Sequence, residues 1–160
     1  MADDQKWLTA SYDETIAYIL SRFHEHHRVQ LQTLIPLAEK VEDVHGDRED
    51  CPVGLAAQLK HIYADLSQHM MKEEQILFPM IKAGQYAMAR MPIQVMEHEH
   101  AEHNDSLDVL RALTNNMTPP ADACNTWQTL YRGVQEFVDD LSLHVHTENN
   151  ILFPRVLNEA

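Results

Sequence analysis

Apolar residues recur at helical spacing in four long segments of the chain. Ser11 and Glu14 have the Ser-x-x-Glu form of a capping box, which predicts that the first helix begins there. Its apolar positions recur every three or four residues as far as Val44, so we expect Pro36 to bend this helix rather than end it. Gly46 is the predicted stop. The apolar positions are Ile16, Ile19, Leu20, Phe23, Leu31, Leu34, Ile35, Leu37, Ala38, Val41 and Val44.

Prolines suggest where the second and third helices lie. Pro52 suits the first position of a helix, because the N–H that it lacks would have no intrahelical partner there. Pro79 is expected to bend or close this helix, and Gly84 to end any extension. Pro92 is expected to open the third helix. The expected core positions are Leu55, Leu59, Ile62, Leu66, Met70 and Leu77 in the second helix, and Val95, Met96, Leu107, Leu110 and Leu113 in the third.

Residues 114–120 (Thr-Asn-Asn-Met-Thr-Pro-Pro) form the clearest loop, and the fourth helix is expected from about residue 121 to residue 157. Its expected core positions are Trp127, Leu130, Val134, Phe137, Leu141, Val145 and Leu152. Four long helices with short connections predict an all-α fold, an antiparallel up-down-up-down four-helix bundle. We assign residues 1–10 to an N-terminal tail and residues 11–160 to the bundle domain.

Size and charge exclude several classes of protein. A chain of 160 residues is long enough for one domain with its own core. The net charge of −13 argues against nucleic acid or an anionic membrane as a partner, since both attract basic surfaces. No apolar run approaches the roughly 20 residues of a membrane span, and no signal-peptide layout is visible, so we expect a cytoplasmic protein. Cys51 and Cys124 form no C-x-x-C motif, which leaves no indication of redox or disulfide chemistry.

One stretch of the chain occurs twice. Residues 65–79 return 75 positions later as residues 140–154, and both copies read D-L-S-x-H-x-x-x-E-x-x-I-L-F-P. Residues four apart lie on one helix face, so the Asp, His and Glu of each copy form a single stripe. An imidazole and a carboxylate one turn apart can bind the same metal ion. Two such stripes facing each other would therefore hold a pair of ions.

The repeat extends to the other two helices. The segment from His24 to His27 corresponds to the segment from His100 to His103, 76 positions on. The chain therefore consists of two related helix pairs, each with one lone histidine and one His-x-x-x-Glu. The two His-x-x-x-Glu pairs are His69/Glu73 and His144/Glu148. Because the histidines within each of the other segments are three residues apart, periodicity leaves open which one reaches the core.

The chain has eleven histidines, and most need a less specific explanation. The His-x-x-x-Glu spacing alone is weak evidence, because His45/Glu49 and His98/Glu102 also fit it. The repeated pairs differ in the preceding Asp, the following I-L-F-P and the duplication itself. Inward-facing His and Glu are costly in a core unless they are paired or bind metal. Five histidines are expected to be solvated or hydrogen-bonded: His26, His45, His61, His98 and His146.

Each ligand histidine needs an acceptor for its second ring nitrogen. Asp65 and Asp140 lie one turn before the histidines of the repeat and have the right spacing for this role. Equally, they fit a solvated position or a pair with Lys or Arg, and the sequence leaves both alternatives open. Glu99, next to His100, is a candidate for proton transfer, and its alternative is a solvated charge.

The proposed donor set consists of four imidazoles and two carboxylates. Without thiolates, this set favours iron or manganese over structural zinc. If Glu73 and Glu148 each bridge two ions, every ion has two His and two carboxylate oxygens. An oxo or hydroxo bridge then leaves about one octahedral position open on each ion. Open positions of this kind suit small ligands such as NO, O2 and H2O2.

The sequence resembles the hemerythrin-like di-iron proteins, specifically the repair-of-iron-centres (RIC) group, from about Tyr18 to Pro154. The matching stretches are S-x-H-M-M-K-E-E-Q-I-L-F-P-M-I-K (67–82), V-M-E-x-E-H (95–100), T-N-N-M-T-P-P (114–120) and H-x-x-x-E-N-N-I-L-F-P (144–154). The resemblance implies that His24 and His100, rather than His27 and His103, are iron ligands. The full ligand set that it implies is His24, His69, Glu73, His100, His144 and Glu148.

The resemblance also implies a function in the repair of iron–sulfur clusters after nitrosative or oxidative damage. Two iron ions would cycle between ferrous and ferric states, with iron donation or NO chemistry, and iron–sulfur proteins would be the clients. Long members carry an additional small N-terminal domain with a cysteine pair, for which this sequence shows nothing corresponding. If those cysteines take part in repair, sensing or scavenging gains weight. The alternatives are a hemerythrin-type O2 or NO binding or sensing protein without repair activity, a di-iron oxidase or peroxidase, and a metal-free structural bundle.

Overall fold

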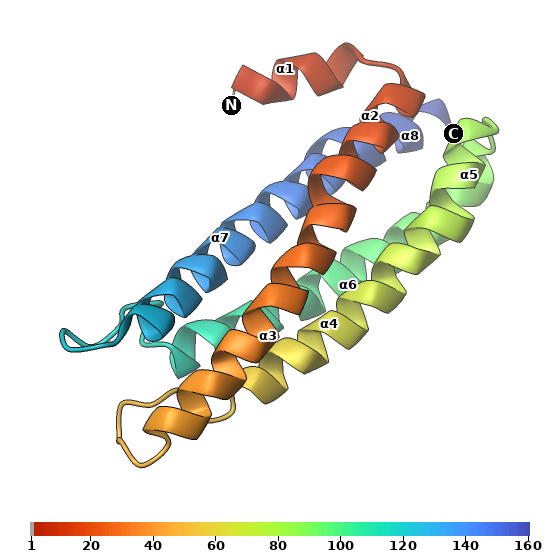
Figure 1. Cartoon of the computed structure of the whole chain (residues 1–160). Coiled ribbons are helices and arrows are strands. Elements are labelled where there is room, and N and C mark those ends of the chain that lie inside the picture. Colours follow the sequence, from red (N-terminus) through yellow and green to blue (C-terminus); the bar gives the residue numbers. More distant parts are fainter. Residues whose placement is uncertain (1) are drawn as a thin grey trace.

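Four long helical rods run antiparallel in the computed structural model, which describes residues 2–160 (Figure 1). Each of three rods is interrupted by a single π-helical turn, labelled η. The rods are α2 (Tyr12–Ile19), η1 (Leu20–His24) and α3 (Glu25–His45); α4 (Leu55–Lys72), η2 (Glu73–Leu77) and α5 (Phe78–Lys82); α6 (Tyr86–Leu113); and α7 (Asn125–Thr147), η3 (Glu148–Leu152) and α8 (Phe153–Glu159). The predicted all-α, up-down-up-down bundle is confirmed.

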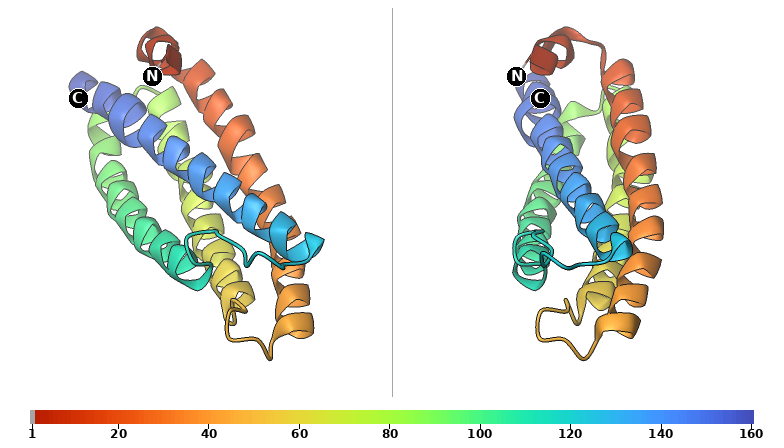
Figure 2. Two further views of the ribbon diagram at one scale, coloured as in Figure 1. Left: turned by 90° about the vertical axis from the view of Figure 1, so that its left-hand side faces the viewer. Right: turned by 60° about the vertical axis from the view of Figure 1, so that its left-hand side comes forward.

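The rods pack in a closed arrangement around one shared interior. Helix α3 lies against both α4 and α7, and α4 lies against α6 (Figure 2). The two ends of the chain lie at the same end of the bundle (Figure 1). Within the described residues, no helix is both long enough and apolar enough to cross a membrane.

A short helix, α1 (Ala2–Thr9), lies within the segment assigned to an N-terminal tail. It crosses one end of the bundle (Figure 1). The ring of Trp7 stacks on Tyr18 with centroids 4.2 Å apart. Arg155 donates hydrogen bonds to the carbonyl oxygens of Trp7 at 2.6 Å and Ala10 at 2.8 Å. The segment therefore packs on the bundle, and its separation from the domain stays a prediction.

Two predicted helix ends of the first rod are confirmed. The Glu14 N–H donates to Ser11 Oγ at 3.1 Å, so Ser11 is the N-cap. Gly46 is the C-cap of α3, and Pro36 lies inside that helix. Of the expected core residues, Val44 is exposed. The hydrophobic pattern therefore identified this rod but extended its buried face one turn too far.

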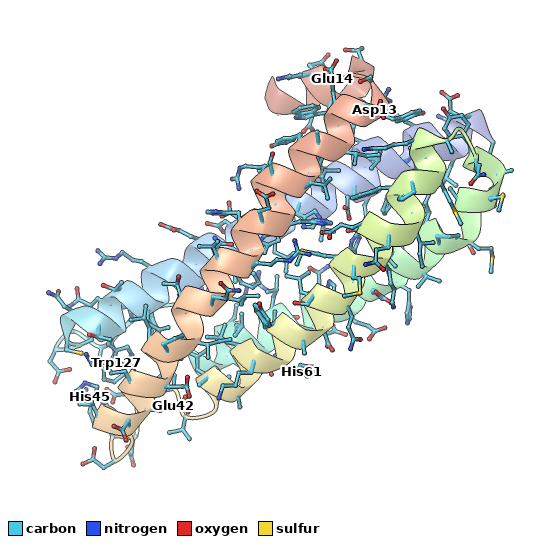
Figure 3. All side chains as sticks on the ribbon, turned by 45° about the vertical axis from the view of Figure 1, so that its right-hand side comes forward. Asp13, Glu14, Glu42, His45, His61 and Trp127 are labelled. Atoms are coloured by element: carbon cyan, nitrogen blue, oxygen red, sulfur yellow. The ribbon has the colours of Figure 1, made fainter. Side chains whose placement is uncertain are left out.

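The second helix begins at Leu55, so the prediction of Pro52 as its first residue is wrong. Gly54 has φ +97°, a left-handed conformation that turns the chain sharply and that residues with a Cβ rarely adopt. The carboxylate of Glu42 accepts hydrogen bonds from the N–H groups of Gly54 at 2.6 Å and Ala56 at 3.0 Å. A side chain from the preceding helix thus caps α4, which short-range patterns do not reveal. Figure 3 labels Glu42 at the end of α3.

The starts of the third and fourth helices also differ from the predictions. Helix α6 begins at Tyr86 and contains Pro92, because an exposed helix face lets water satisfy the carbonyl that proline cannot bond. Met88 and Met91 on this helix are indeed exposed, and so is Val95, which was expected in the core. Helix α7 begins at Asn125 rather than near residue 121, because a turn precedes it. In that turn the Ala123 N–H donates a hydrogen bond to the Pro120 carbonyl oxygen.

Two hydrophobic clusters fill the bundle, one toward each end. One includes Leu66, Met70 and Phe137, and the other includes Phe23 and Phe153. Polar side chains separate them, since the aromatic residues of both clusters contact buried histidines. This arrangement places a polar layer inside an otherwise apolar core.

Candidate metal centre

Helical irregularities position the two glutamates of the repeat. The Phe78 N–H donates to the backbone carbonyl oxygen of Glu73, and the Phe153 N–H donates to that of Glu148. Each bond closes a π turn, which is wider than an α-helical turn. A proline follows each phenylalanine directly, and its ring would clash with the carbonyl four residues earlier in a regular helix. The wider turn relieves that clash in these two rods, whereas the π turn of the first rod, η1, has no proline after it. π turns are frequent at functional sites. The π turns were not among the features predicted from the sequence.

The structure brings all six predicted site residues together in the polar layer, each at most 2% exposed. Within the described residues they form two groups whose possible ligand atoms lie within 4.8 Å of one another. The first group comprises His24, Glu73, His144 and Glu148, and the second comprises His69, Glu73, His100 and Glu148. Both groups therefore share both glutamates.

Each glutamate faces one histidine of each group. Glu73 Oε1 lies 3.1 Å from His24 Nε2 and 3.6 Å from His69 Nε2. Glu148 Oε2 lies 3.1 Å from His144 Nε2, and Glu148 Oε1 lies 3.0 Å from His100 Nε2. This arrangement suits carboxylates that bridge two adjacent ions.

The outward nitrogens of three histidines bind oxygen acceptors. His24 Nδ1 donates to Glu74 Oε2 at 2.6 Å, and His69 Nδ1 donates to Glu99 Oε1 at 2.9 Å. His100 Nδ1 donates to Asn149 Oδ1 at 2.8 Å. Because Nδ1 carries the hydrogen in each ring, Nε2 presents a lone pair to the glutamates. All three histidines are thus held in the tautomer that binds metal through Nε2.

The inward nitrogens of these histidines converge. His69 Nε2 and His100 Nε2 lie 3.1 Å apart, and both rings donate their hydrogens outward. Among the described residues, Glu73 Oε2 and Glu148 Oε1 have no hydrogen-bond partner. Buried polar atoms left in this state are costly, and a cation at each group would satisfy them. The residues therefore fit two metal ions.

The chain matches the family model "Hemerythrin HHE cation binding domain" over residues 15–156. It belongs to the hemerythrin family.

Its relatives include longer proteins with one described role. The chain is 65% identical over 157 residues to "Probable iron-sulfur cluster repair protein" of Haemophilus influenzae, covering 98% of this chain and 70% of the relative. It is 58% identical over 154 residues to "Iron-sulfur cluster repair protein YtfE" of Musicola paradisiaca, covering 96% of this chain and 69% of the relative. A relative of the same name from Yersinia pseudotuberculosis is 54% identical over 153 residues, with the same coverage. The resemblance to the iron-centre repair group of hemerythrin-like proteins is confirmed.

Burial alters the proton affinities of this hemerythrin centre. It lowers the pKa of His24 to about 4 and the pKa of His69 to about 3, so both rings are neutral near pH 7. Burial also raises the pKa of Glu73, and the negative charge of Glu148 raises it further. Burial works against the ionised form of Glu148 as well, but His144 and His100 outweigh it and lower the pKa of that carboxyl. With His24 and His69 neutral and negative charge on the glutamates, the centre favours added cations.

Neither His27 nor His103 belongs to the two groups, although both are buried. His27 Nε2 lies 3.1 Å from His144 Nδ1, so His27 contacts a predicted ligand from outside. His103 lies beside His69, with ring centroids 4.8 Å apart. Its Nδ1 has no hydrogen-bond partner within residues 2–160. Helix packing thus separates each pair of histidines into an inner and an outer member.

The structure decides the open question about the two aspartates of the repeat. Asp140 binds Arg22 at 2.9 Å, and Asp65 binds His61 at 3.2 Å, so neither contacts the histidine one turn later. For Asp140 this is the alternative of a pair with Arg, and Asp65 has the alternative of a solvated position, because it is half exposed. Glu99 instead supplies the acceptor for His69 and also binds Lys72 at 2.6 Å. Its role in proton transfer stays a prediction.

The remaining histidines lie outside the centre, as expected. His26, His61 and His98 are about half or more exposed, and each pairs with a carboxylate. His146 pairs with Asp4. His45 stacks on Trp127 with ring centroids 5.0 Å apart at the far end of the bundle (Figure 3). These five positions confirm the simpler explanation given to them.

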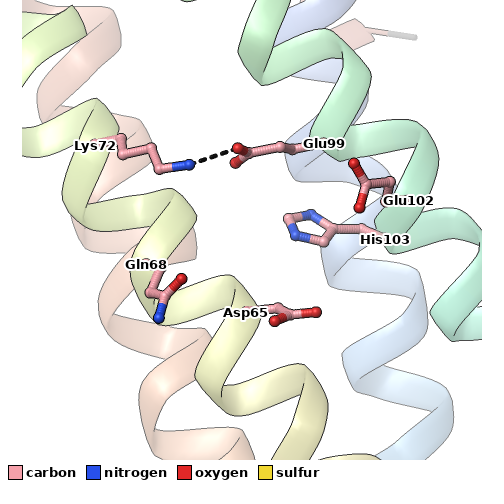
Figure 4. Close-up of a pocket in the computed structure, with 6 residues that line it drawn as sticks. All are labelled: Asp65, Gln68, Lys72, Glu99, Glu102 and His103. Atoms are coloured by element: carbon pink, nitrogen blue, oxygen red, sulfur yellow. Dashed lines mark hydrogen bonds and ion pairs between the residues drawn. The ribbon is translucent and has the colours of Figure 1, made fainter.

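A polar cavity of about 140 Å³ lies beside the second group. Figure 4 shows it between α4 and α6, with Lys72 and Glu99 joined across one end. Its lining residues are Asp65, Gln68, Lys72, Glu99, Glu102 and His103. Glu99 and His103 also contact His69, so the cavity adjoins the hemerythrin centre through these two side chains.

Proposed function

We propose that the protein supports the repair of damaged iron–sulfur clusters with a di-iron centre. The proposed ligands are His24, His69, Glu73, His100, His144 and Glu148. The observation that carries the proposal is the sharing of both buried glutamates by two His/Glu groups. The names of the relatives, which are 54–65% identical, support the assignment to cluster repair. Iron–sulfur proteins are then the clients.

The nature of the donors supports iron as the metal. Imidazole and carboxylate without thiolate suit iron and manganese, and carboxylates shared between two ions suit a bridged pair. When bound, iron would supply ferrous–ferric redox chemistry and open positions for NO, O2 or H2O2, with an oxo or hydroxo bridge between the ions. The chain contributes the rest of the site. Its outward hydrogen bonds orient the imidazoles, and its two hydrophobic clusters keep water from the polar layer.

The proposed location is the cytoplasm, and the state of the cysteines agrees with it. Cys51 and Cys124 are both free, which fits a compartment where thiols stay reduced. A reducing compartment also suits iron that must return to the ferrous state.

Metal content and a repair assay test the proposal together. We expect the purified protein to bind two iron ions per chain and, when loaded with iron, to restore the activity of a dehydratase whose [4Fe–4S] cluster has been damaged by NO. The double variant His69→Ala/His144→Ala should lose both the iron and the repair. The matched control is His61→Ala/His98→Ala, because both of these histidines are exposed and lie outside the centre.

Two results would contradict the proposal in different ways. Undiminished iron in the His69→Ala/His144→Ala variant would exclude the proposed ligands. Normal iron content and reversible binding of O2 or NO, with no restoration of the damaged dehydratase, would instead support a binding or sensing protein without repair activity.

A further inference from the structure

His144 differs from the other three inward-facing histidines in the group that its outward nitrogen contacts. His24, His69 and His100 reach a side-chain oxygen, whereas His144 Nδ1 reaches a ring nitrogen of His27. A carboxylate can only accept a hydrogen bond, but a neutral imidazole nitrogen either donates or accepts, depending on its tautomer. The contact therefore favours metal binding by His144 only if His27 carries its hydrogen on the other nitrogen.

A series of hydrogen-bonded side chains determines the tautomer of His27. Gln30 Nε2 donates to Asp140 Oδ2 at 2.9 Å, which orients the amide oxygen toward His27. Gln30 Oε1 lies 3.2 Å from His27 Nδ1, and an oxygen there can only accept, so Nδ1 carries the hydrogen. His27 Nε2 then presents a lone pair to His144 Nδ1 at 3.1 Å. As a result, Nδ1 of His144 carries the hydrogen and Nε2 is free to bind metal.

The first member of this series, Asp140, is held near the surface by two further contacts. Arg22 donates to Asp140 Oδ1 at 2.9 Å, and His26 Nε2 lies 3.2 Å from Asp140 Oδ2. Asp140 is 17% exposed, whereas His27 at the inner end is fully buried. The aspartate of the second motif copy thus reaches His144 through two intervening side chains, although it does not touch that histidine.

The other half of the repeat lacks this series of side chains. The positions equivalent to His27, Gln30 and Asp140 are His103, Ser106 and Asp65. Ser106 is too short to connect the other two, and His103 Nδ1 has no partner among the described residues. A small gap lined by Asp65, His103 and Ser106 lies at the place equivalent to that of the hydrogen-bonded series. His69 Nδ1 instead donates its hydrogen bond to Glu99, which stands at the position equivalent to Phe23.

We propose that Asp140, Gln30 and His27 are positioning residues that fix His144 in its metal-binding tautomer, on one side of the centre only. This inference rests on the metal centre of the proposed function but not on cluster repair. It predicts that removing one member of this series of side chains weakens ion binding at one of the two metal positions more than at the other. Gln30 is the suitable residue to replace, because it is partly exposed and its hydrogen bonds go to His27 and Asp140, which are not predicted ligands.

The test compares two variants of the whole protein: Gln30→Ala and Ser106→Ala. Alanine at position 30 removes the oxygen acceptor of His27 Nδ1. Ser106→Ala is the matched control at the equivalent position of the other half. In protein loaded with zinc, which is diamagnetic, nitrogen-15 NMR of the imidazoles reports the tautomer of His27. Competition with a chelator measures how tightly each of two ferrous ions is held.

We expect a single His27 tautomer, with hydrogen on Nδ1, in the unaltered protein and in Ser106→Ala. Gln30→Ala should show mixed tautomers, and one of its two ferrous ions should bind about 10–100-fold more weakly. A His27 hydrogen on Nε2 in the unaltered protein would overturn the inference without any variant. Equal affinities in Gln30→Ala and Ser106→Ala would also overturn it. Failure to bind two metal ions at all would instead contradict the proposed function.

Discussion

His69 Nε2 and His100 Nε2 lie 3.1 Å apart in the interior of the bundle, and both face the glutamates. Two lone pairs at this distance repel each other unless a proton or a cation lies between them. The rings stay there because Glu99 and Asn149 bind their outward nitrogens and the two hydrophobic clusters hold the helices. The fold thus maintains an arrangement that a bound cation would stabilise.

Replacing Glu73 by Gln should stabilise the metal-free protein while removing metal binding. Burial and Glu148 raise the pKa of Glu73, so near pH 7 its carboxyl costs free energy that a neutral amide of the same shape does not. We expect the free energy of unfolding to rise by on the order of 1 kcal/mol, or about 2–4 °C in Tm. Calorimetry of the metal-free variant measures this change, with Glu102→Gln at an exposed position as the control. A lower Tm in metal-free Glu73→Gln would contradict the electrostatic argument.

Glu74→Gln and Glu99→Gln should weaken metal binding without unfolding the protein. Each carboxylate accepts a hydrogen bond from a proposed ligand, His24 or His69, and an amide is a weaker acceptor than a charged oxygen. We expect ferrous iron affinity to fall about 10–100-fold in competition with a chelator. Asp105→Asn, at an exposed position on α6, should leave the affinity unchanged. Unchanged affinity in both glutamate variants would mean that these contacts do not orient the ligands.

Glu42→Ala should destabilise the bundle far from the centre. The Glu42 carboxylate binds two N–H groups at the start of α4, and its negative charge favours a helix N-terminus. We expect a loss of about 1–2 kcal/mol in urea unfolding, with iron content unchanged. Glu39→Ala serves as the control, because Glu39 is half exposed and forms only a long 3.4 Å pair with Lys60. Equal losses in the two variants would show that the capping contacts contribute nothing specific.

Acid should destabilise the metal-free protein below about pH 6.5. Burial lowers the pKa of His24 and His103 to about 4, of His69 to about 3 and of His27 to about 2. The unfolded chain therefore takes up these protons near pH 6.5, and the folded protein only at lower pH. Stability falls as the pH drops through this interval, by up to about 1.4 kcal/mol per pH unit for each histidine.

Urea unfolding of the metal-free protein at several pH values measures this dependence. The raised pKa values of Glu73 and His100 act in the opposite direction, but they are two groups against four, and the Glu73→Gln background removes one of them. His98→Gln, at an exposed position, should leave the profile unchanged. A constant free energy of unfolding between pH 6.5 and pH 4 would contradict the role of buried histidines.

The sequence by itself determined the four helical rods and four of the candidate metal ligands. The spacing of apolar residues predicts four antiparallel rods, because each rod must bury one face. The repeated Asp-x-x-x-His-x-x-x-Glu stripe predicts His69, Glu73, His144 and Glu148 on inward faces, because residues four apart share a side of a helix. Helix starts were less predictable where a distant side chain decides them, as Glu42 does at α4.

Only the tertiary structure decided which of the neighbouring histidines face the glutamates. His24 and His27 are three residues apart and both fully buried, so periodicity cannot separate them, and the resemblance alone favoured His24 and His100. The packing of the rods and the π turn that ends at His24 direct Nε2 of His24 to Glu73 and leave His27 behind His144. The partners of the outward nitrogens come from other helices, so their identity depends on how the rods cross. The duplicated Asp140 therefore reaches His144 only through Gln30 and His27, a connection that exists in space and not along the chain.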